Sequence, residues 1–265
     1  MYDKVAVNIG INKYPNPANR LNGCVPDAKL MRRDLMKKFN FDKSFLLLDS
    51  KATYERTVNT IESSLKMLND GGHWVFTVSS HGTTVPDRNG DEKDKRDEAI
   101  CLYDRILIDD VFRKILLHAP HNMKMTIITD CCHSGTITRG SYIRKFGSMP
   151  ANKYAKPRYL PPNDDSFAMS NDVLSSRVPA FIPQEEMNEV LITGCMSHEF
   201  SYDAVFNGKY NGALTYNLSK IFNKYQDITY NQLMALIKAE LPSTHYPQTP
   251  QLEGSEANKK RIIFS

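Results

Sequence analysis

The stretch from Met125 to Gly135 constrains the fold of this chain more than any other part of its sequence. Its first half, Met125 to Thr129, is rich in β-branched residues and predicts a buried strand. Where that strand ends, the sequence places an acid, two thiols and an imidazole, in the order Asp130, Cys131, Cys132 and His133. Because ligands of open α/β sheets bind beyond the carboxyl ends of the strands, this stretch predicts both a fold class and the position of a site.

Strands alternate with helices along most of the chain. Short apolar runs predict further strands at Lys4–Ile9, Ser44–Leu48, Trp74–Ser79, Ala99–Tyr103, Glu189–Thr193 and Arg261–Phe264. Helical periodicity predicts helices that begin near Asp27, which is placed to cap the first of them, and near Val58, Asp109, Gly212 and Thr229. The pattern predicts an α/β fold in which residues 1–265 form a single domain, with a mostly parallel sheet flanked by helices on both faces.

Composition excludes several classes of function. A net charge of +4 over 265 residues is too small and too scattered to predict nucleic acid or a membrane surface as a partner. No apolar run reaches the roughly 18 residues of a membrane span, and no signal-peptide pattern follows Met1, so we expect a cytoplasmic protein. The five cysteines are odd in number and lack zinc-ribbon spacing, which favours neither a disulfide framework nor a structural metal.

Regular patterns fail between Thr136 and Met187, where prolines stand among Asn, Ser and basic residues. A segment this long without predicted structure is usually functional or disordered. Two interpretations are open: a loop that the protein cuts in itself, or a surface loop with ordinary solvated charges. Under the first, the candidate cleavage sites are Arg139, Arg144, Lys145, Lys153, Lys156, Arg158 and Arg177.

Two strand ends carry the residues with nucleophilic and basic chemistry. His81 follows one predicted strand and Cys132 follows another, 51 positions later. This pair fits a cysteine hydrolase, in which the imidazole takes the thiol proton and later protonates the leaving amine. The backbone N–H groups of Gly82 and Cys132 are candidates for binding the oxyanion. The alternative is that Cys132 is a small buried core residue, as most free cysteines are.

The motifs around these two residues resemble those of metacaspases and bacterial orthocaspases, relatives of the caspases. The resemblance rests on Ser79-Ser-His81-Gly82 and Asp130-Cys-Cys132-His-Ser-Gly135, and it extends in order from Gly23-Cys-Val-Pro-Asp27 to Gln248-Thr-Pro-Gln-Leu252. It implies a caspase-hemoglobinase fold, a monomer, and a cysteine-type endopeptidase that works through a Cys–His dyad and an acyl-enzyme. The nucleophile signature of caspases proper, Gln-Ala-Cys-x-Gly, is absent, which argues against strict aspartate specificity.

Asp130 is better suited to binding a substrate than to activating a thiol. Residues two apart in an extended strand point the same way, so Asp130 and Cys132 share a side and Cys131 faces the opposite one. A neighbouring carboxylate raises the pKa of a thiol, which opposes activation, whereas it matches an Arg or Lys side chain of a substrate. The resemblance implies that the pocket for that side chain is built from Cys24, Asp27, Ser79 and Asp130, so we predict cleavage of proteins or peptides after Arg or Lys. For Asp27, a helix N-cap is an equally good interpretation.

The resemblance also implies an activating calcium ion, although no cofactor is required for the chemistry. The corresponding acids are Asp97, Asp109 and Asp110, and hard oxygen ligands suit calcium. The alternative is a helix start beside a solvated charge run. The sequence departs from the calcium-dependent pattern just after the nucleophile, where Ile137-Thr-Arg139 replaces an expected acid. A second class of function also stays open, a caspase-like pseudoenzyme or interaction module without turnover.

Overall fold

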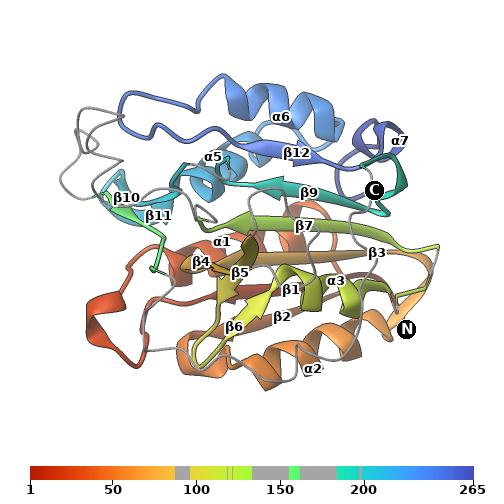
Figure 1. The fold of residues 1–265 in the computed structure, drawn as a ribbon. Coiled ribbons are helices and arrows are strands. Elements are labelled where there is room, and N and C mark those ends of the chain that lie inside the picture. Colours follow the sequence, from red (N-terminus) through yellow and green to blue (C-terminus); the bar gives the residue numbers. More distant parts are fainter. Residues whose placement is uncertain (87–95, 118, 121, 133–154, 162–183, 197–198) are drawn as a thin grey trace.

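The chain folds around one six-stranded sheet (Figure 1). The computed structural model describes residues 1–86, 96–117, 119–120, 122–132, 155–161, 184–196 and 199–265. The central sheet has the order β12-β9-β7-β3-β1-β2, and every neighbouring pair is parallel except β12 with β9. Its strands are β1 Tyr2–Gly10, β2 Lys43–Leu48, β3 Leu68–Ser79, β7 Lys124–Asp130, β9 Glu189–Thr193 and β12 Gln251–Glu253.

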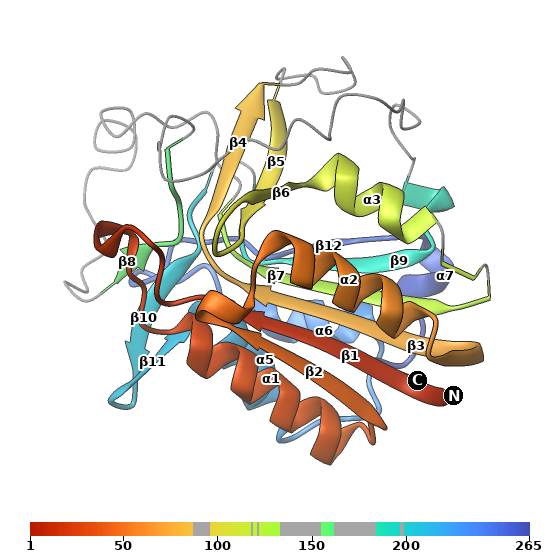
Figure 2. The same ribbon diagram turned by 90° about the horizontal axis from the view of Figure 1, so that it is seen from below.

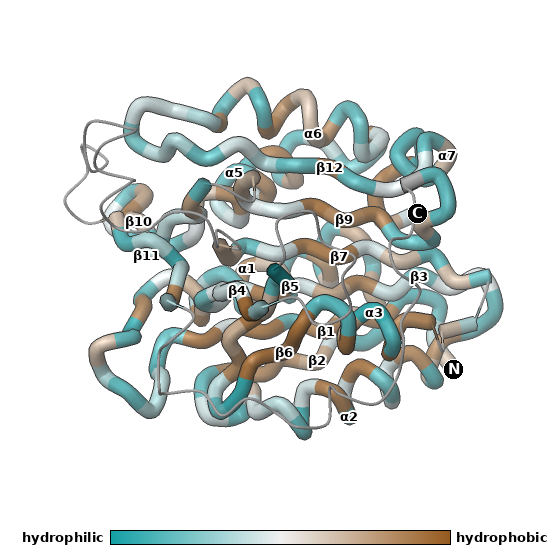
Figure 3. The backbone as a smooth tube through the Cα atoms, in the orientation of Figure 1, coloured by the Kyte–Doolittle hydropathy of each residue, from teal (hydrophilic) through white to brown (hydrophobic). Residues whose placement is uncertain are grey.

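Helices cover both faces of this sheet, as the alternating pattern predicted (Figure 2). The α-helices are α1 Cys24–Lys38, α2 Tyr54–Leu65, α3 Asp109–Leu117, α5 Ala213–Phe222, α6 Tyr230–Lys238 and α7 Glu256–Lys259, with single turns of 3-10 helix η1 Pro17–Asn19, η2 Asp49–Lys51 and η4 Gln184–Glu186. On β1, Val5, Val7 and Ile9 pack into the core under α2 and α3, while Ala6 packs with α1, α5 and α6. The most hydrophobic backbone stretches include the central strands β7 and β9, which fits a sheet buried on both faces (Figure 3).

Two small antiparallel sheets extend the fold beyond the central sheet. One has the order β4-β5-β6, with β4 Gly82–Pro86, β5 Arg96–Cys101 and β6 Ile106–Ile108. The other has the order β11-β10-β8, with β8 Lys156–Pro157, β10 Tyr202–Phe206 and β11 Lys209–Gly212. In Figures 1 and 2, β10 and β11 lie beyond the end of the central sheet from which β4 leaves.

Two expectations about secondary structure are wrong. The segment Arg261–Phe264 is not a strand of the sheet; Phe264 has a φ of 55° and packs against Phe39 and Phe222, while β12 forms the edge. Asp27 does not cap α1, because the helix begins at Cys24 with Gly23 as its N-cap. No helix in the part of the chain that the structure describes combines the length and the apolarity needed to cross a bilayer.

Candidate active site

The carboxyl ends of three neighbouring strands lie side by side at one end of the central sheet. The register pairs Gly10 of β1 with Ser79 of β3, and Ser79 with Asp130 of β7. Because these strands are parallel, the residues that follow Ser79 and Asp130 leave the sheet at the same end. The topology therefore brings together the two motifs that lie 51 positions apart in the sequence, with His81 on one connection and Cys132 on the other.

His81 is buried and oriented by two residues of the segment after β1, Tyr14 and Asn19. Its Nε2 atom lies 2.8 Å from the carbonyl oxygen of Asn19, and its ring stacks at a tilt on Tyr14 with centroids 5.3 Å apart. The Tyr14 hydroxyl also accepts a hydrogen bond from the His81 backbone N–H at 3.0 Å. A carbonyl can only accept, so Nε2 carries the proton, and Nδ1 is the basic nitrogen of the neutral ring.

The two adjacent cysteines lie in different environments, as strand alternation predicted. Cys131 is buried in the core cluster under α2 and α3, whereas Cys132 joins the cluster of Phe200 and Tyr202. The Cys132 Sγ atom accepts a hydrogen bond from the Ser201 N–H at 2.9 Å and lies 3.2 Å from the Ser201 carbonyl oxygen. A hydrogen bond with the Cys132 side chain, together with burial, raises the pKa of Cys195 well above its usual value. All five cysteines are buried free thiols.

Three carboxylates converge on one buried arginine beside these residues. The Arg158 Nη2 atom lies 2.7 Å from Asp27 and 3.1 Å from Asp203, and Nη1 lies 3.2 Å from Asp130. Nη1 also donates to the Ser79 hydroxyl at 2.8 Å. The guanidinium fork thus uses both of its ends, the geometry in which arginine is bound most specifically.

Each carboxylate is held in place by a second set of donors. Asp27 accepts from the Ser79 hydroxyl, the Asn211 side chain and the Gly212 N–H, and Asp203 accepts from the backbone N–H groups of Asn22 and Gly23. Asp130 accepts from the Ser201 hydroxyl and from both the N–H and hydroxyl of Thr215. These donors orient the three acids around the guanidinium, so the protein itself, and not Arg158 alone, holds the carboxylates in place.

The charges in this pocket shift the pKa values of its members. Burial raises the pKa of Asp27 to about 6; Arg158 opposes that rise and Asp130 adds to it. Burial alone would lower the pKa of Arg158, but the charges of Asp130, Asp27 and Asp203 raise it well above its usual value. Burial also raises the pKa of Cys24, so this thiol is a neutral wall of the pocket. The arrangement stabilises a guanidinium in a place where a neutral side chain would leave several carboxylates without a counter-ion.

Glycine at position 212 leaves room for the guanidinium. A Cβ atom built at Gly212 would collide with the Asp130 carboxylate and with Nη1 of Arg158. The Gly212 N–H also donates to Asp27, so the backbone itself forms one wall of the pocket. Any larger residue at this position would fill the space that a basic side chain occupies.

The main chain of Arg158 lies beside the predicted oxyanion donors. Its carbonyl oxygen accepts hydrogen bonds from the Gly82 N–H at 2.9 Å and the Cys132 N–H at 3.2 Å. Two convergent N–H donors on one carbonyl are the arrangement that stabilises the oxyanion of acyl transfer. The predicted pocket residues Cys24, Asp27, Ser79 and Asp130 all lie around the Arg158 side chain. The carbonyl oxygen of the same residue accepts from the two donors.

The predicted metal ligands lie apart from this pocket. Asp97 is buried on β5, while Asp109 and Asp110 open α3. Burial raises the pKa of Asp109 to about 7, and the charges of Glu98 and Asp110 add to that rise. Asp109 Oδ1 is buried with no hydrogen-bond partner in the described part of the chain. This oxygen suits a hard cation, but among the described residues no three His, Cys, Asp or Glu side chains are grouped to hold a metal ion.

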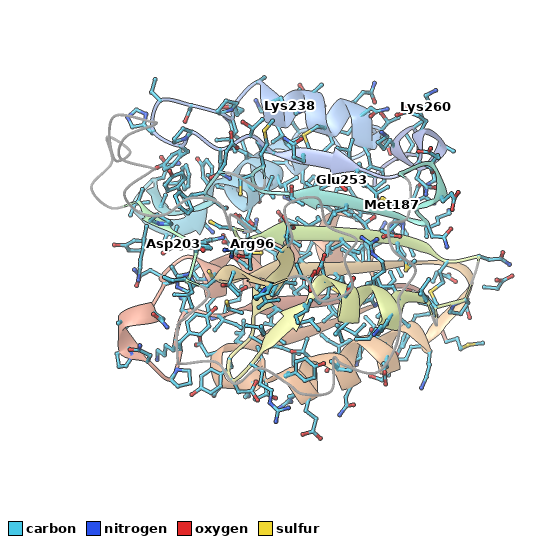
Figure 4. The ribbon with its side chains drawn as sticks, in the orientation of Figure 1. Arg96, Met187, Asp203, Lys238, Glu253 and Lys260 are labelled. Atoms are coloured by element: carbon cyan, nitrogen blue, oxygen red, sulfur yellow. The ribbon has the colours of Figure 1, made fainter. Side chains whose placement is uncertain are left out.

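Sequence reasoning missed part of this site. Asp203 stands in Ser201-Tyr-Asp203, a further part of the resemblance to metacaspases, and a role in ordering the pocket or a loop was one interpretation of it. Nothing local marks it as a contact of the guanidinium; Figure 4 labels it at the β10–β11 hairpin. Ser201 and Thr215 were missed as supports of Asp130, because their contacts cross 71 and 85 positions. Arg158 was one of seven basic candidates, and only its docking distinguishes it. His133 and most of the predicted irregular loop fall outside the described residues.

The fold and this site define a caspase-like protein. The family model for the caspase domain of cysteine peptidases matches residues 3–261. The chain belongs to this family, and its relatives confirm the predicted resemblance to metacaspases.

Metacaspase-9 from Arabidopsis thaliana is 28% identical over 320 residues, which cover 99% of this chain and 97% of that protein. Metacaspase-3 from the same plant is 30% identical over 234 residues, covering 82% of this chain but only 59% of the relative. The solved structure of protein GSU0716 from Geobacter sulfurreducens superposes with a TM-score of 0.75 at 25% identity, covering 99% of this chain and 98% of that one. Caspase-1 from Spodoptera frugiperda shares the fold, with a TM-score of 0.56 at 12% identity over 96% of this chain and 87% of its own.

Proposed function

We propose that this protein is a cysteine endopeptidase that cleaves protein or peptide substrates after Arg or Lys. The observation that supports this most strongly is Arg158, whose guanidinium contacts Asp27, Asp130 and Asp203 while its carbonyl accepts from Gly82 and Cys132. One residue thus joins a pocket for a basic side chain to a pair of oxyanion donors. Because both ends of the fork are used, we expect Arg to be preferred over Lys, which offers a single point charge.

In the proposed mechanism, the Cys132 thiol transfers its proton to Nδ1 of His81 and the sulfur attacks the substrate carbonyl carbon. The N–H groups of Gly82 and Cys132 stabilise the oxyanion that forms. His81, held by Asn19 through Nε2, then protonates the leaving amine, and water hydrolyses the acyl-enzyme. The Asp130 carboxylate takes no part in proton transfer; it binds the basic side chain.

We further propose that Asp97, Asp109 and Asp110 are the ligands of an activating calcium ion, as the resemblance to metacaspases implies. These three side chains are not grouped in this structure, so calcium binding would have to draw them together, and the ion would then neutralise repelling acids. Hard oxygen donors support this site, as does the buried Asp109 Oδ1 atom, which has no hydrogen-bond partner among the described residues. The proposed compartment is the cytoplasm, which five buried free thiols favour, since disulfides are rare there. A monomer is expected from the resemblance to metacaspases.

The test is a panel of fluorogenic peptides that differ only in the residue before the scissile bond. Arg should be cut fastest, then Lys, with Asp and Ala far slower. Cys132→Ala should lose about 10³-fold or more in kcat/KM. Cys131→Ala is the matched control, because it removes the adjacent buried thiol from a different core cluster and should keep the activity. An arginyl chloromethyl ketone should label Cys132 and not Cys131. Faster cutting after Asp would refute the specificity, and binding of Arg peptides without turnover would indicate a pseudoenzyme.

A further inference from the structure

The segment from Ala155 to Pro161 runs through the site as an extended chain. Its strand β8 pairs antiparallel with β10, Pro157 opposite Tyr202 and Lys156 opposite Asp203. The Arg158 N–H donates to the Ser201 carbonyl at 3.0 Å, which continues this ladder up to the pocket. The main chain before Arg158 is therefore held as an added strand, the way in which extended peptides dock on sheet edges.

The main chain is held on the other side of Arg158 as well. Tyr159 forms a parallel bridge with Gly82, and the Leu160 N–H donates to the Gly82 carbonyl at 3.0 Å. The Tyr159 ring packs on Phe200 with centroids 5.8 Å apart, and Leu160 is buried in the core cluster. The peptide bond between Arg158 and Tyr159 is thus fixed from both sides, with its carbonyl oxygen between the two oxyanion donors.

The neighbouring basic residue of the same segment is placed differently. Lys156 donates from Nζ to the carbonyl oxygens of Ala18 and Arg20, at 3.3 and 2.6 Å, whereas Arg158 forms ion pairs with the three carboxylates. Among the basic residues of this segment, only Arg158 combines a side chain in the acidic pocket with a carbonyl at the donors. Charge alone does not distinguish these two residues, but their positions do.

We infer that the Arg158–Tyr159 bond is the bond that this protein cuts in its own chain, with Ala155–Pro161 acting as an intramolecular substrate. The inference rests on the proposed peptidase function. The Cys132 sulfur bonds to the Arg158 carbonyl carbon, the bond to the Tyr159 nitrogen breaks, and the thiol proton passes through His81 to that nitrogen. Water then cleaves the thioester, which releases the Arg158 carboxylate and regenerates the thiol.

This placement also makes the intact segment a competitor of other substrates. A substrate with a basic side chain needs the same carboxylates and the same donors that Arg158 occupies. Because the segment belongs to the same chain, it competes intramolecularly, and a separate substrate must overcome its effective concentration. Peptidase activity should therefore rise as the Arg158–Tyr159 bond is cut, and the rate of self-cleavage should not depend on protein concentration.

The experiment follows freshly purified chain by intact mass and by cleavage of an Arg peptide. The wild type should yield two fragments, one ending at Arg158 and one beginning at Tyr159, in parallel with a rise in peptide cleavage. Cys132→Ala should yield neither fragment. Arg158→Gln should lose this cut, whereas Lys156→Gln, the matched control that removes the same charge two residues earlier, should retain it. Tyr159→Pro keeps the buried guanidinium and should also block the cut, which covers the case in which Arg158→Gln fails to fold.

Loss of the self-processing site and loss of the peptidase function give different results in this experiment. Cleavage of Arg peptides by a chain whose Arg158–Tyr159 bond stays intact would overturn the self-processing site and leave the peptidase function standing. Unchanged fragments in Arg158→Gln or Tyr159→Pro would overturn it as well, because they would place the cut elsewhere. A third result would overturn both proposals. In it, the wild type, Arg158→Gln and Tyr159→Pro would all leave Arg peptides uncut, and none of the three proteins would cut its own chain.

Discussion

Replacing Asp27 with Asn tests whether the carboxylates around Arg158 select basic substrates. The Asp27 carboxylate receives the guanidinium at 2.7 Å, the Ser79 hydroxyl at 2.8 Å and the Gly212 N–H at 2.9 Å. An Asn amide is the same size but carries no charge. Its NH2 group is a hydrogen-bond donor, so it would face the donor groups that now bind the carboxylate. The substitution therefore removes the attraction for a guanidinium without opening a cavity.

The expected magnitude follows from the contacts that remain. Truncating one partner of a buried charge pair costs about 2–5 kcal/mol, and because Asp130 and Asp203 still contact the guanidinium we expect the lower part of that range. A loss of about 2–3 kcal/mol corresponds to a decrease of about 30- to 150-fold in kcat/KM. The loss should be confined to charged substrates.

The assay compares two peptides that differ only in arginine or citrulline before the scissile bond. Citrulline has the shape of arginine without its charge, and Arg158 of the intact chain competes with both peptides equally, so the ratio of their kcat/KM values isolates the charge term. Asp34→Asn is the control, because Asp34 is a buried acid on the same helix that contacts Arg33, Lys38 and Ser219 instead. It should lower the Tm and leave the ratio unchanged.

The pH dependence gives a second readout of the same variant. Burial raises the pKa of Asp27 to about 6, so the carboxylate is neutral below that pH and charged above it. In the wild type, kcat/KM for the arginine peptide should fall as pH drops through about 6, and Asp27→Asn should lack this limb. A folded Asp27→Asn protein with the wild-type ratio of arginine to citrulline cleavage would refute the role of this carboxylate.

Two further predictions concern titration and calcium. Burial lowers the pKa of His73 from 6.5 to about 3, so the unfolded chain binds the extra proton first and the free energy of unfolding should fall by about 1.4 kcal/mol per pH unit below pH 6.5. Urea denaturation between pH 7.5 and 4.5 should show a shallower decrease in His73→Gln; equal slopes in the two proteins would contradict this. If Asp97, Asp109 and Asp110 bind calcium, the ion should raise both the Tm and the activity of the wild type, and Asp109→Asn should abolish both effects. Activity that a chelator leaves unchanged would remove calcium from the mechanism.

Much of the fold could be predicted from local patterns. The strand at Glu189–Thr193 and the helices near Gly212 and Thr229 have the expected positions, because apolar periodicity and the Thr229 capping box act over a few residues. The sheet β4-β5-β6 was largely missed, because its short strands are defined by pairing and not by their own composition. The segment Arg261–Phe264 was taken for a strand because Ile262, Ile263 and Phe264 are apolar. In the structure the Phe264 ring packs instead against Phe39, at the end of α1, and Phe222 of α5.

In the pocket, too, some residues could be assigned from the sequence and others only from the structure. Asp130 and Cys132 could be separated from Cys131 by strand alternation alone, since that rule depends only on the backbone. The cap proposed for Asp27 was wrong, because the sequence shows an acid in a first helical turn but not the arginine 131 positions away that contacts it.

The sequence by itself determined the parallel strands of the central sheet, the two motifs and their order, because these depend on neighbouring residues. Only the tertiary structure decided that Asp203 completes the pocket and that Arg158 fills it. Both facts depend on contacts across 45 or more positions. The charged side chains involved lose their hydration on burial, and only the contacts between them offset that loss. The same burial makes Arg158, one of seven basic residues in an irregular stretch, the residue whose carbonyl meets the two oxyanion donors.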